Sequence, residues 1–359
     1  MKMTIYLNSN STDYTTTHRL NPSDKALPQV IEMQDEYEEY VYKVKQYINA
    51  PDDAKVIITS GASEACATCM HWTKTVFDKG TVWGSMFDHS SIKENALNYD
   101  LKYSQSDKMP SDTIAIVITQ VNPKTGEIYD NDILFSIINQ TKYIGSNSFF
   151  RGESNYNVLL YRPLVFLDAS QSITKVPIDM QKYRLNAVYF SLHKIGGEIG
   201  TGLLIISPRS DTPFKPLIAG HQQEALRGGT YPLDFVLSCQ FFNKTDNVQE
   251  RIASWTECFN LLRKYKMDVY VPKYKHLYNT FLINVGRVCP LKIINALAEI
   301  HGIYIGTASA CRSEEIELYG STEAQDDYIR ISFKHGKDIN ASIIKKIVEV
   351  YQMVLREED

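Results

Sequence analysis

The chain has 359 residues, enough for two domains or for one large core with an appendage. Its hydrophobic fraction of 43% and charged fraction of 22% are those of an ordinary globular protein. A net charge of −4 provides no electrostatic reason to expect nucleic acid or a membrane surface as a partner. No apolar run approaches the roughly 20 residues of a membrane span, and the N-terminus turns polar too soon for a signal peptide. We therefore expect a cytoplasmic protein.

Six cysteines are scattered along the chain, which is sparse for a disulfide framework. Cys66 and Cys69 form a C-x-x-C pair, but no second Cys/His pair with metal-ligand spacing lies near them. The surrounding "SEACATCMHWTKTVF" is typical of a buried helix. We interpret both cysteines as small core residues rather than as metal ligands.

In chain order, the first predicted elements are the short strand "TIYL" (4–7) and a charged, aromatic helix over 27–48. Six further apolar strands follow: "KVIIT" (55–59), "TVWGS" (81–85), "TIAIVIT" (113–119), "LVFLD" (164–168), "NAVYFS" (186–191) and "GLLIIS" (202–207). Helical periodicity separates them at 63–78 and 130–140, whereas 142–162 is polar and aperiodic and indicates an irregular insertion. Apolar strands alternating with helices predict an α/β fold with a mostly parallel sheet covered on both faces.

The C-terminal part has a different rhythm. Residues 232–266 carry the periodicity of one long helix. After them, short strands such as "FLINV" and "YIRISF" alternate with the helical segments "LKIINALAEIHG" and "INASIIKKIVEVYQMVL". This pattern predicts a compact α+β unit and a domain boundary near 250–270.

Two segments have the chemistry of a ligand site. In "VIITSGASEA" a strand ends at Gly61, and Ala62 and Ser63 open a helix, whose exposed N–H groups and macrodipole suit a phosphate. The segment lacks the lysine of a Walker loop, so a nucleoside triphosphate is not expected.

The second candidate region consists of the ends of two successive predicted strands. Asp168 ends one predicted strand, and the next strand ends just before His193 and Lys194. Viewed alone, Asp168 is equally well a helix N-cap, and Lys194 is more often a solvated lysine. Together they meet what pyridoxal phosphate (PLP) requires of a protein, which is a carboxylate facing the pyridine nitrogen and a lysine that forms a Schiff base.

Six motifs, "SGASEA", "DHSS", "LDASQS", "FSLHK", "RGGT" and "ASACRS", occur in an order that resembles the class V aminotransferase-like PLP enzymes of fold type I. Within them, the chain is most similar to the NifS/IscS-type cysteine desulfurases, from about residue 6 to residue 333. The resemblance implies a large PLP-binding domain with a seven-stranded, mostly parallel sheet over residues 13–255. It also implies a small α+β domain, built from 1–12 and 256–359, that carries the catalytic cysteine loop.

The resemblance further implies a role for each matching residue. Lys194 binds the cofactor covalently, Asp168 pairs with the pyridine nitrogen, Gln171 contacts the ring hydroxyl, and His89 stacks on the ring and assists proton transfer. The implied phosphate ligands are Ala62, Ser63, Ser191 and His193. Thr230 matches a threonine that reaches the phosphate of the neighbouring subunit, which implies a homodimer.

The implied reaction converts L-cysteine to L-alanine and leaves the sulfur on Cys311 as a persulfide, which a sulfur-acceptor protein would then take. Arg330 and Asn10 are the implied substrate ligands, Arg330 as a bidentate clamp on the substrate carboxylate. The polar flanks of Cys311, "ACRSEE", favour an exposed nucleophile over a small buried residue in a turn.

One departure from the family pattern is "VNPKTG" (121–126), where Pro123 replaces an asparagine that contacts the ring hydroxyl. Asn122 is a candidate substitute. Two alternatives stay open: another class V enzyme, such as a selenocysteine lyase or an aminotransferase, and a degenerate relative that acts through a partner protein. Cys311 discriminates among the enzymes, because transamination needs no protein thiol.

Overall fold

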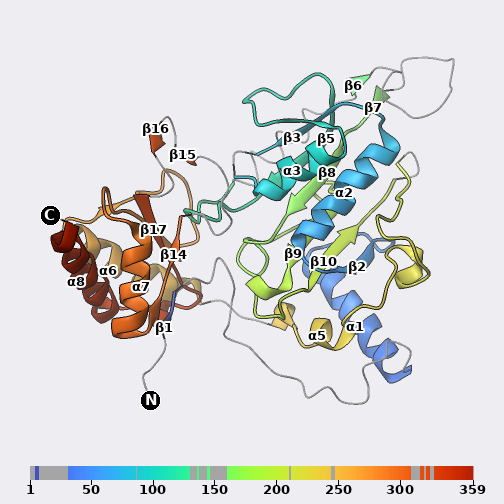
Figure 1. Ribbon diagram of the computed structural model, residues 1–359. Coiled ribbons are helices and arrows are strands. Elements are labelled where there is room, and N and C mark those ends of the chain that lie inside the picture. The colour runs from blue at the N-terminus through green and yellow to red at the C-terminus, as the bar shows by residue number, and fades with distance from the viewer. Residues whose placement is uncertain are drawn as a thin grey trace. The chain divides into compact units, whose positions relative to one another are not determined.

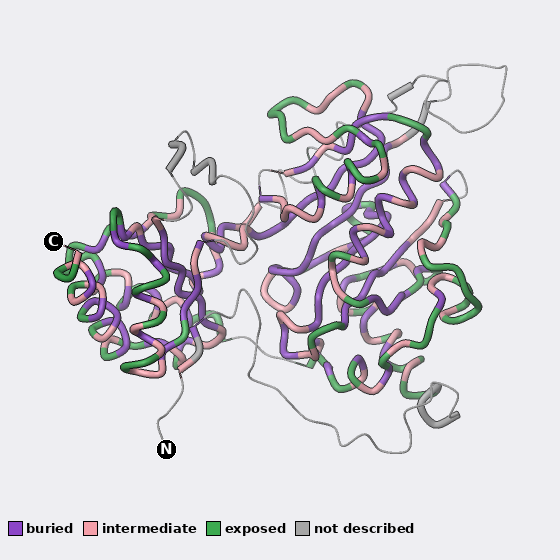
Figure 2. Tube along the Cα trace, viewed as in Figure 1, coloured by how far each residue is buried: buried purple, intermediate pink, exposed green. Residues whose placement is uncertain are grey.

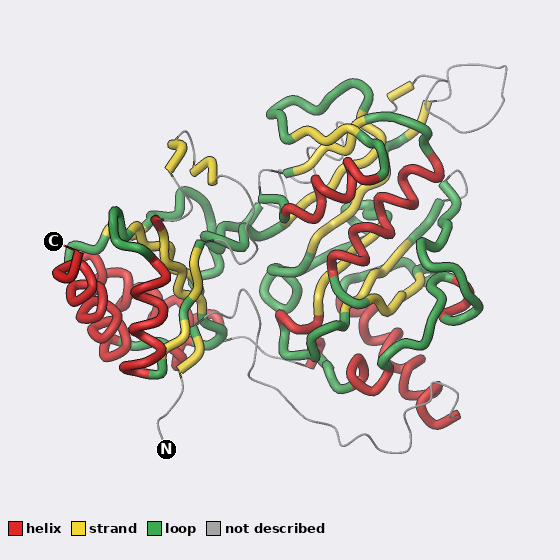
Figure 3. The backbone as a smooth tube through the Cα atoms, in the orientation of Figure 1, coloured by secondary structure: helices red, strands yellow, loops and turns green. Residues whose placement is uncertain are grey.

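The computed structural model describes residues 5–7, 31–85, 87–129, 136, 144–145, 160–209, 212–243, 247–308, 316–318, 321–323 and 327–358. Backbone contacts divide the chain into two compact units (Figures 1 and 3). The large unit comprises residues 16–121 and 129–244; the small unit comprises Met1–Thr15, Asn122–Ile128 and Thr245–Asp359. The sequence predicted only the two ends of the chain for the small domain, so the assignment of 122–128 to it is a new finding.

The large unit is built on a seven-stranded sheet in the order β2-β10-β9-β8-β5-β3-β4. The strands are β2 (Lys55–Thr59), β3 (Thr81–Gly84), β4 (Lys102–Ser104), β5 (Thr113–Thr119), β8 (Leu164–Asp168), β9 (Ala187–Ser191) and β10 (Gly202–Ile206). All neighbours are parallel except β10, which runs antiparallel to both β2 and β9. The predicted mostly parallel, seven-stranded sheet is thereby confirmed.

Strand β4 was missed by the sequence prediction. It is a three-residue edge strand, "KYS", with exposed and half-exposed side chains, so it lacks the apolar run that marks the buried strands. The predicted strand "TIYL" exists as β1 (Ile5–Tyr6), but it pairs with β13 (Ile303–Tyr304) in the small unit.

Helices cover both faces of the large sheet (Figure 1). Helices α2 (Ala62–Val76) and α3 (Ser90–Asn98) pack with one apolar cluster, and α1 (Ile31–Tyr47) and α5 (Leu233–Leu237) pack with the other. Side chains of β9 alternate between the two clusters, with Tyr189 facing α2 and Phe190 facing α1. Every residue of β9 is therefore buried (Figure 2), which explains the continuous apolar run in the sequence.

The prediction of one long helix over 232–266 is wrong. The segment contains α5, a short 3-10 helix η3 (Phe241–Asn243) and α6 (Val248–Lys264). Its two halves belong to different cores, because Phe241 is buried in the large unit, whereas Trp255 and Leu262 are buried in the small unit. The Asn247 side chain accepts a hydrogen bond from the Glu250 N–H and caps the start of α6.

The small unit contains an antiparallel sheet in the order β11-β12-β17-β14. Its strands are β11 (Asp268–Val269), β12 (Thr280–Asn284), β14 (Gly306–Thr307) and β17 (Tyr328–Ser332). Helices α6, α7 (Pro290–His301) and α8 (Ala341–Glu358) bury their apolar faces in the same core. Among the described residues, no helix has the length and apolar character needed to cross a membrane.

Four further short strands form two separate pairs, and three 3-10 helices are also described: η1 (Leu192–Lys194), η2 (Gln223–Ala225) and η5 (Gly336–Asp338). Strands β6 (Ile144–Gly145) and β7 (Leu160–Tyr161) pair antiparallel, as do β15 (Ile316–Leu318) and β16 (Ser321–Glu323). The predicted helix over 130–140 lies outside the described residues except at Ser136, and the predicted insertion over 142–162 lies outside them except at its ends.

Candidate active site

The turn between β2 and α2 is joined to the end of β9. The Ala62 N–H donates to Ser191 Oγ at 2.8 Å, and Thr59 Oγ1 donates to the Gly61 carbonyl at 3.0 Å. In the sheet, Gly202 of β10 lies opposite both Thr59 and Ser191. A Cβ on Gly202 would lie 2.6 Å from the Gly61 Cα, so only glycine allows this close approach.

This junction has the properties of an anion cradle. It combines the N-terminal end of a 15-residue helix with a hydroxyl group at the neighbouring strand end. Because Ser191 Oγ accepts from Ala62, its hydroxyl hydrogen remains able to donate to a ligand. Ser63, the other predicted phosphate ligand on the turn, is exposed. The hydrogen bond between Ala62 and Ser191 brings together two of the four residues that the resemblance implies as phosphate ligands.

Asp168 ends β8 with a buried carboxylate. It is 6% exposed, lies opposite Thr119 of β5 and Tyr189 of β9, and its Oδ1 accepts from the Ser170 N–H at 2.9 Å. A buried carboxylate is costly unless it meets donors or a positive charge. Gln171 is also buried in the turn that follows. This pair has the chemistry to hold a protonated ring nitrogen and a neighbouring hydroxyl.

Lys194 lies in a tight turn directly after β9. The 3-10 helix η1 (Leu192–Lys194) is followed by two N–H groups that donate back to the Leu192 carbonyl, from Ile195 at 2.9 Å and from Gly197 at 2.8 Å. Lys194 and His193 are both half-buried. Burial, and then the charge of Lys194, lower the pKa of His193 to about 4, so this imidazole is neutral at pH 7.

His89 is the N-cap residue of α3. Its Nδ1 accepts from the Ser91 N–H at 3.2 Å and lies 2.9 Å from Ser91 Oγ. Because Nδ1 is the acceptor, the neutral ring carries its proton on Nε2. This tautomer leaves Nε2 as the nitrogen that can donate a proton.

Asp88 precedes His89 and had no predicted role. Its carboxylate accepts hydrogen bonds from Thr119 Oγ1 at 2.8 Å, from the Tyr103 hydroxyl at 3.0 Å and from the Ser85 hydroxyl and N–H. Although Asp88 as a whole is only partly buried, burial of its carboxylate raises the pKa to about 7, against the opposing effect of these donors. The donors come from β4, β5 and the end of β3, so only the folded sheet brings them together.

The small unit contains the predicted substrate ligand Arg330. This residue of β17 is 1% exposed, and its Nη1 donates to the Pro123 carbonyl at 3.2 Å. Asn122 Oδ1 accepts from the Lys124 N–H at 2.8 Å, and the Asn122 carbonyl accepts from Gly126. The Asn122 side-chain oxygen is thus engaged in a hydrogen bond within the turn. The Pro123 carbonyl accepts from Arg330 and orients its guanidinium group.

The remaining predicted residues are Thr230, Cys311 and Asn10. Thr230 is exposed and follows Gly229 at the end of a surface loop. Cys311 and Asn10 lie outside the described residues. Cys66 and Cys69 are fully buried in α2, as expected for core residues.

Comparisons with known proteins point to one family. The aminotransferase class-V family matches residues 9–227. The cysteine desulfurase IscS of Plasmodium falciparum is 27% identical over 298 residues, which cover 75% of this chain and 50% of that protein. The IscS of Pseudomonas putida is 28% identical over 213 residues, or 53% of this chain and 47% of that protein. The chain thus spans about half the length of these curated relatives.

Solved structures agree on the fold. A NifS-like protein superposes with a TM-score of 0.79 at 19% sequence identity. The superposition covers 98% of this chain and 100% of the NifS-like chain. A NifS-like protein from Rickettsia africae gives a TM-score of 0.73 at 20% identity, covering 99% and 100%. These similarities confirm the predicted fold class.

The pKa of Asp88 predicts a pH dependence of stability. Because the folded value of about 7 exceeds the ordinary 3.8, the folded protein binds more protons than the unfolded chain between these values. Protonation of Asp88 therefore stabilises the folded state, and this stabilisation is fully present below about pH 4 and is lost as the pH rises through 7. Urea unfolding between pH 5 and 8 should show a flatter pH dependence for Asp88→Asn than for the wild type or for Asp53→Asn, at an exposed turn. Equal slopes in all three proteins would contradict the assignment.

Proposed function

Because the chain belongs to the aminotransferase class-V family, we propose that it is a PLP-dependent cysteine desulfurase that converts L-cysteine to L-alanine and forms a persulfide on Cys311. The observation that carries the proposal is the meeting of three strand ends in the large unit. Asp168 at the end of β8, Lys194 after β9 and the anion cradle after β2 supply, in one unit, an acid, an amine and a phosphate site.

These residues fit PLP by the chemistry of the donor set. The proposed phosphate ligands Ala62, Ser63, Ser191 and His193 would offer an N-terminal helix end, hydroxyl groups and a neutral imidazole to an anion. Asp168 would hold the ring nitrogen, Gln171 the ring hydroxyl, and Lys194 the covalent bond to the cofactor. When bound, PLP supplies an electron sink for negative charge at the substrate Cα.

The protein groups have separate tasks in this reaction. The Lys194 amine takes the proton from the substrate Cα. The Asp168 carboxylate would keep the ring nitrogen positively charged. The neutral His89 ring offers the proton on Nε2. The Arg330 guanidinium, oriented by the Pro123 carbonyl, and Asn10 would bind the substrate carboxylate.

The proposed sulfur transfer is balanced without an external oxidant. The Cβ–S bond of cysteine breaks, an S–S bond forms between that sulfur and Cys311 Sγ, and Cβ gains a hydrogen to become the methyl group of alanine. The sulfur is oxidised and Cβ is reduced by the same two electrons. The persulfide then holds a sulfur atom for a thiol of an acceptor protein.

The five cysteines among the described residues are free thiols, which fits our placement of the protein in the reducing cytoplasm. Recovery of the protein in an exported or membrane fraction would contradict this placement.

The cofactor assignment predicts colour. Purified wild-type protein should absorb near ~420 nm, as PLP does when it is joined covalently to a lysine. Lys194→Ala should be colourless after dialysis, whereas Lys182→Ala, which alters an exposed lysine of the same unit, should remain yellow. Equal absorption of the Lys194→Ala protein would exclude Lys194 as the anchor.

The nucleophile assignment predicts loss of sulfur transfer. Cys311→Ser should lower sulfide release from L-cysteine, in the presence of a reducing thiol, by roughly 10³-fold or more, as when a covalent nucleophile is removed from other enzymes. Cys289→Ser, which alters an exposed cysteine, should release sulfide at the wild-type rate. Wild-type alanine formation by Cys311→Ser would remove Cys311 from this role and favour another class V activity.

The assignment of Thr230 to the phosphate of a second subunit predicts an obligatory homodimer. Its support is the exposed position of Thr230 at the end of a loop. Sedimentation should show a dimer at working concentrations, and Thr230→Ala should weaken PLP binding several-fold through the loss of one hydrogen bond. A fully active monomer at all concentrations would contradict the shared site.

A further inference from the structure

The loop over residues 218–229, which directly precedes Thr230, closes on itself. The Gly228 N–H donates to the Ile218 carbonyl at 2.8 Å. A Cβ on Gly228 would lie 2.1 Å from the Ala219 carbonyl oxygen, and one on Gly220 would lie 2.5 Å from the Gly228 Cα. The two ends of the loop are therefore in backbone contact.

The tip of the loop has an unfavourable backbone conformation. Gln223, Glu224 and Ala225 have φ angles of 49°, 57° and 61°, in the left-handed region that disfavours residues other than glycine. Three such residues in succession persist only where other contacts hold them.

One of these contacts is with the edge of the large sheet. The Gln223 side-chain amide accepts from the Ile58 N–H at 2.6 Å and donates to the Ile58 carbonyl at 3.1 Å. Ile58 belongs to β2, which lies at the opposite edge of the sheet from β4. The glutamine side chain thus takes the place of a neighbouring strand and ties the loop to β2.

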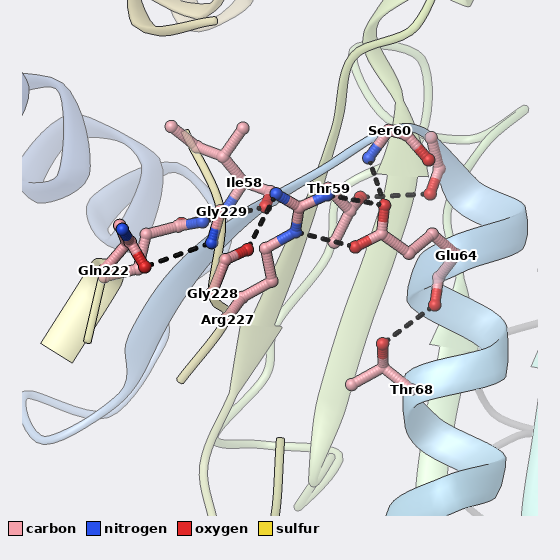
Figure 4. A network of polar contacts seen from close by, with 11 residues as sticks. Ile58, Thr59, Ser60, Glu64, Thr68, Gln222, Arg227, Gly228 and Gly229 are labelled. Atoms are coloured by element: carbon pink, nitrogen blue, oxygen red, sulfur yellow. Dashed lines mark hydrogen bonds and ion pairs between the residues drawn. The ribbon is translucent and has the colours of Figure 1, made fainter. Parts of the chain in front are cut away.

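The second contact is an ion pair with the first turn of α2 (Figure 4). Arg227 Nε lies 2.9 Å from Glu64 Oε1, and Nη2 lies 3.2 Å from Oε2, which makes the pair bidentate. Glu64 Oε2 also accepts from the Ser60 N–H at 2.8 Å, and Arg227 Nη1 donates to the Gly228 carbonyl at 3.1 Å. The pair therefore connects the neck of the loop with the turn that forms the anion cradle.

The Arg227–Glu64 pair is shielded from solvent, with side chains 18% and 12% exposed. Burial raises the pKa of Glu64, but the hydrogen bonds from Arg227 and Ser60 outweigh it and hold the pKa below its ordinary value. A second ion pair on the same loop, Lys55–Glu224, has side chains 45% and 70% exposed. Solvent screening makes an exposed pair of this kind weak, so the two pairs form a matched comparison.

We propose that Arg227 is a positioning residue for the cofactor phosphate, which it does not itself need to touch. By pairing with Glu64 it holds the cradle turn against the loop whose next residue is Thr230, and it neutralises a carboxylate beside an anion site. The inference rests on the proposed function, since it takes the cradle and Thr230 as phosphate ligands. In the dimer, the same pair would link the cradle of one subunit with Thr230, which would contact the phosphate bound to the other subunit.

The test compares two probes on apo protein: PLP, and pyridoxal, which lacks the phosphate. Arg227→Ala should weaken PLP binding roughly tenfold or more, because it loosens the cradle and leaves Glu64 unpaired near the phosphate. Pyridoxal binding should stay within about twofold of the wild type, since pyridoxal makes no phosphate contact. Lys55→Ala should change neither affinity.

Two further variants separate positioning from a general loss of folding. Arg227→Lys keeps the positive charge but loses the bidentate geometry of the guanidinium group. It should recover part of the PLP affinity that Arg227→Ala loses. The double variant Glu64→Gln/Arg227→Ala removes the unpaired carboxylate and should bind PLP more tightly than Arg227→Ala alone. Unchanged PLP affinity in Arg227→Ala, or equal losses for PLP and pyridoxal, would overturn the proposal. A wild-type protein that binds PLP without forming its absorption band would instead contradict the proposed function.

Discussion

The candidate site depends on one hydrogen bond, from the Ala62 N–H to Ser191 Oγ. It joins the start of α2 to the end of β9, although the two residues are 129 positions apart in the chain. The antiparallel strand β10 lies between β2 and β9, and Gly202 allows the Gly61 turn to approach closely. The strand pairing and this hydrogen bond together bring the start of α2 beside the residues that follow β9.

The polar groups around this junction divide into those that meet a ligand and those that hold the others. Asp168, His89 and Lys194 have the chemistry of ligand-binding groups, whereas Asp88 and Glu64 are engaged with neighbouring protein donors. Such supporting contacts determine how well a site is preorganised, because a charged group that is held in place loses less entropy on binding. The Arg227–Glu64 pair extends this support to the surface loop that precedes Thr230.

Apolar patterns in the sequence predicted the strands that are buried on both faces. Strands β5, β8, β9 and β10 are buried on both faces, so each appears as an unbroken apolar run. Strand β4 and the break between α5 and α6 were missed because neither is encoded by apolar periodicity alone. The first is an exposed edge strand, and the second occurs where successive apolar residues enter two different cores.

The sequence by itself determined the family, through the order of its motifs. It also predicted the candidate acid, amine and thiol, because reacting groups must be particular residue types. Only the tertiary structure decided how these groups are supported. The donors around Asp88 come from three strands, Pro123 orients Arg330 through a backbone carbonyl, and Arg227 finds Glu64 across 163 positions. These contacts join residues that are far apart in the chain, and the Pro123 contact uses a backbone carbonyl, which every residue type possesses, so no local pattern marks them in advance.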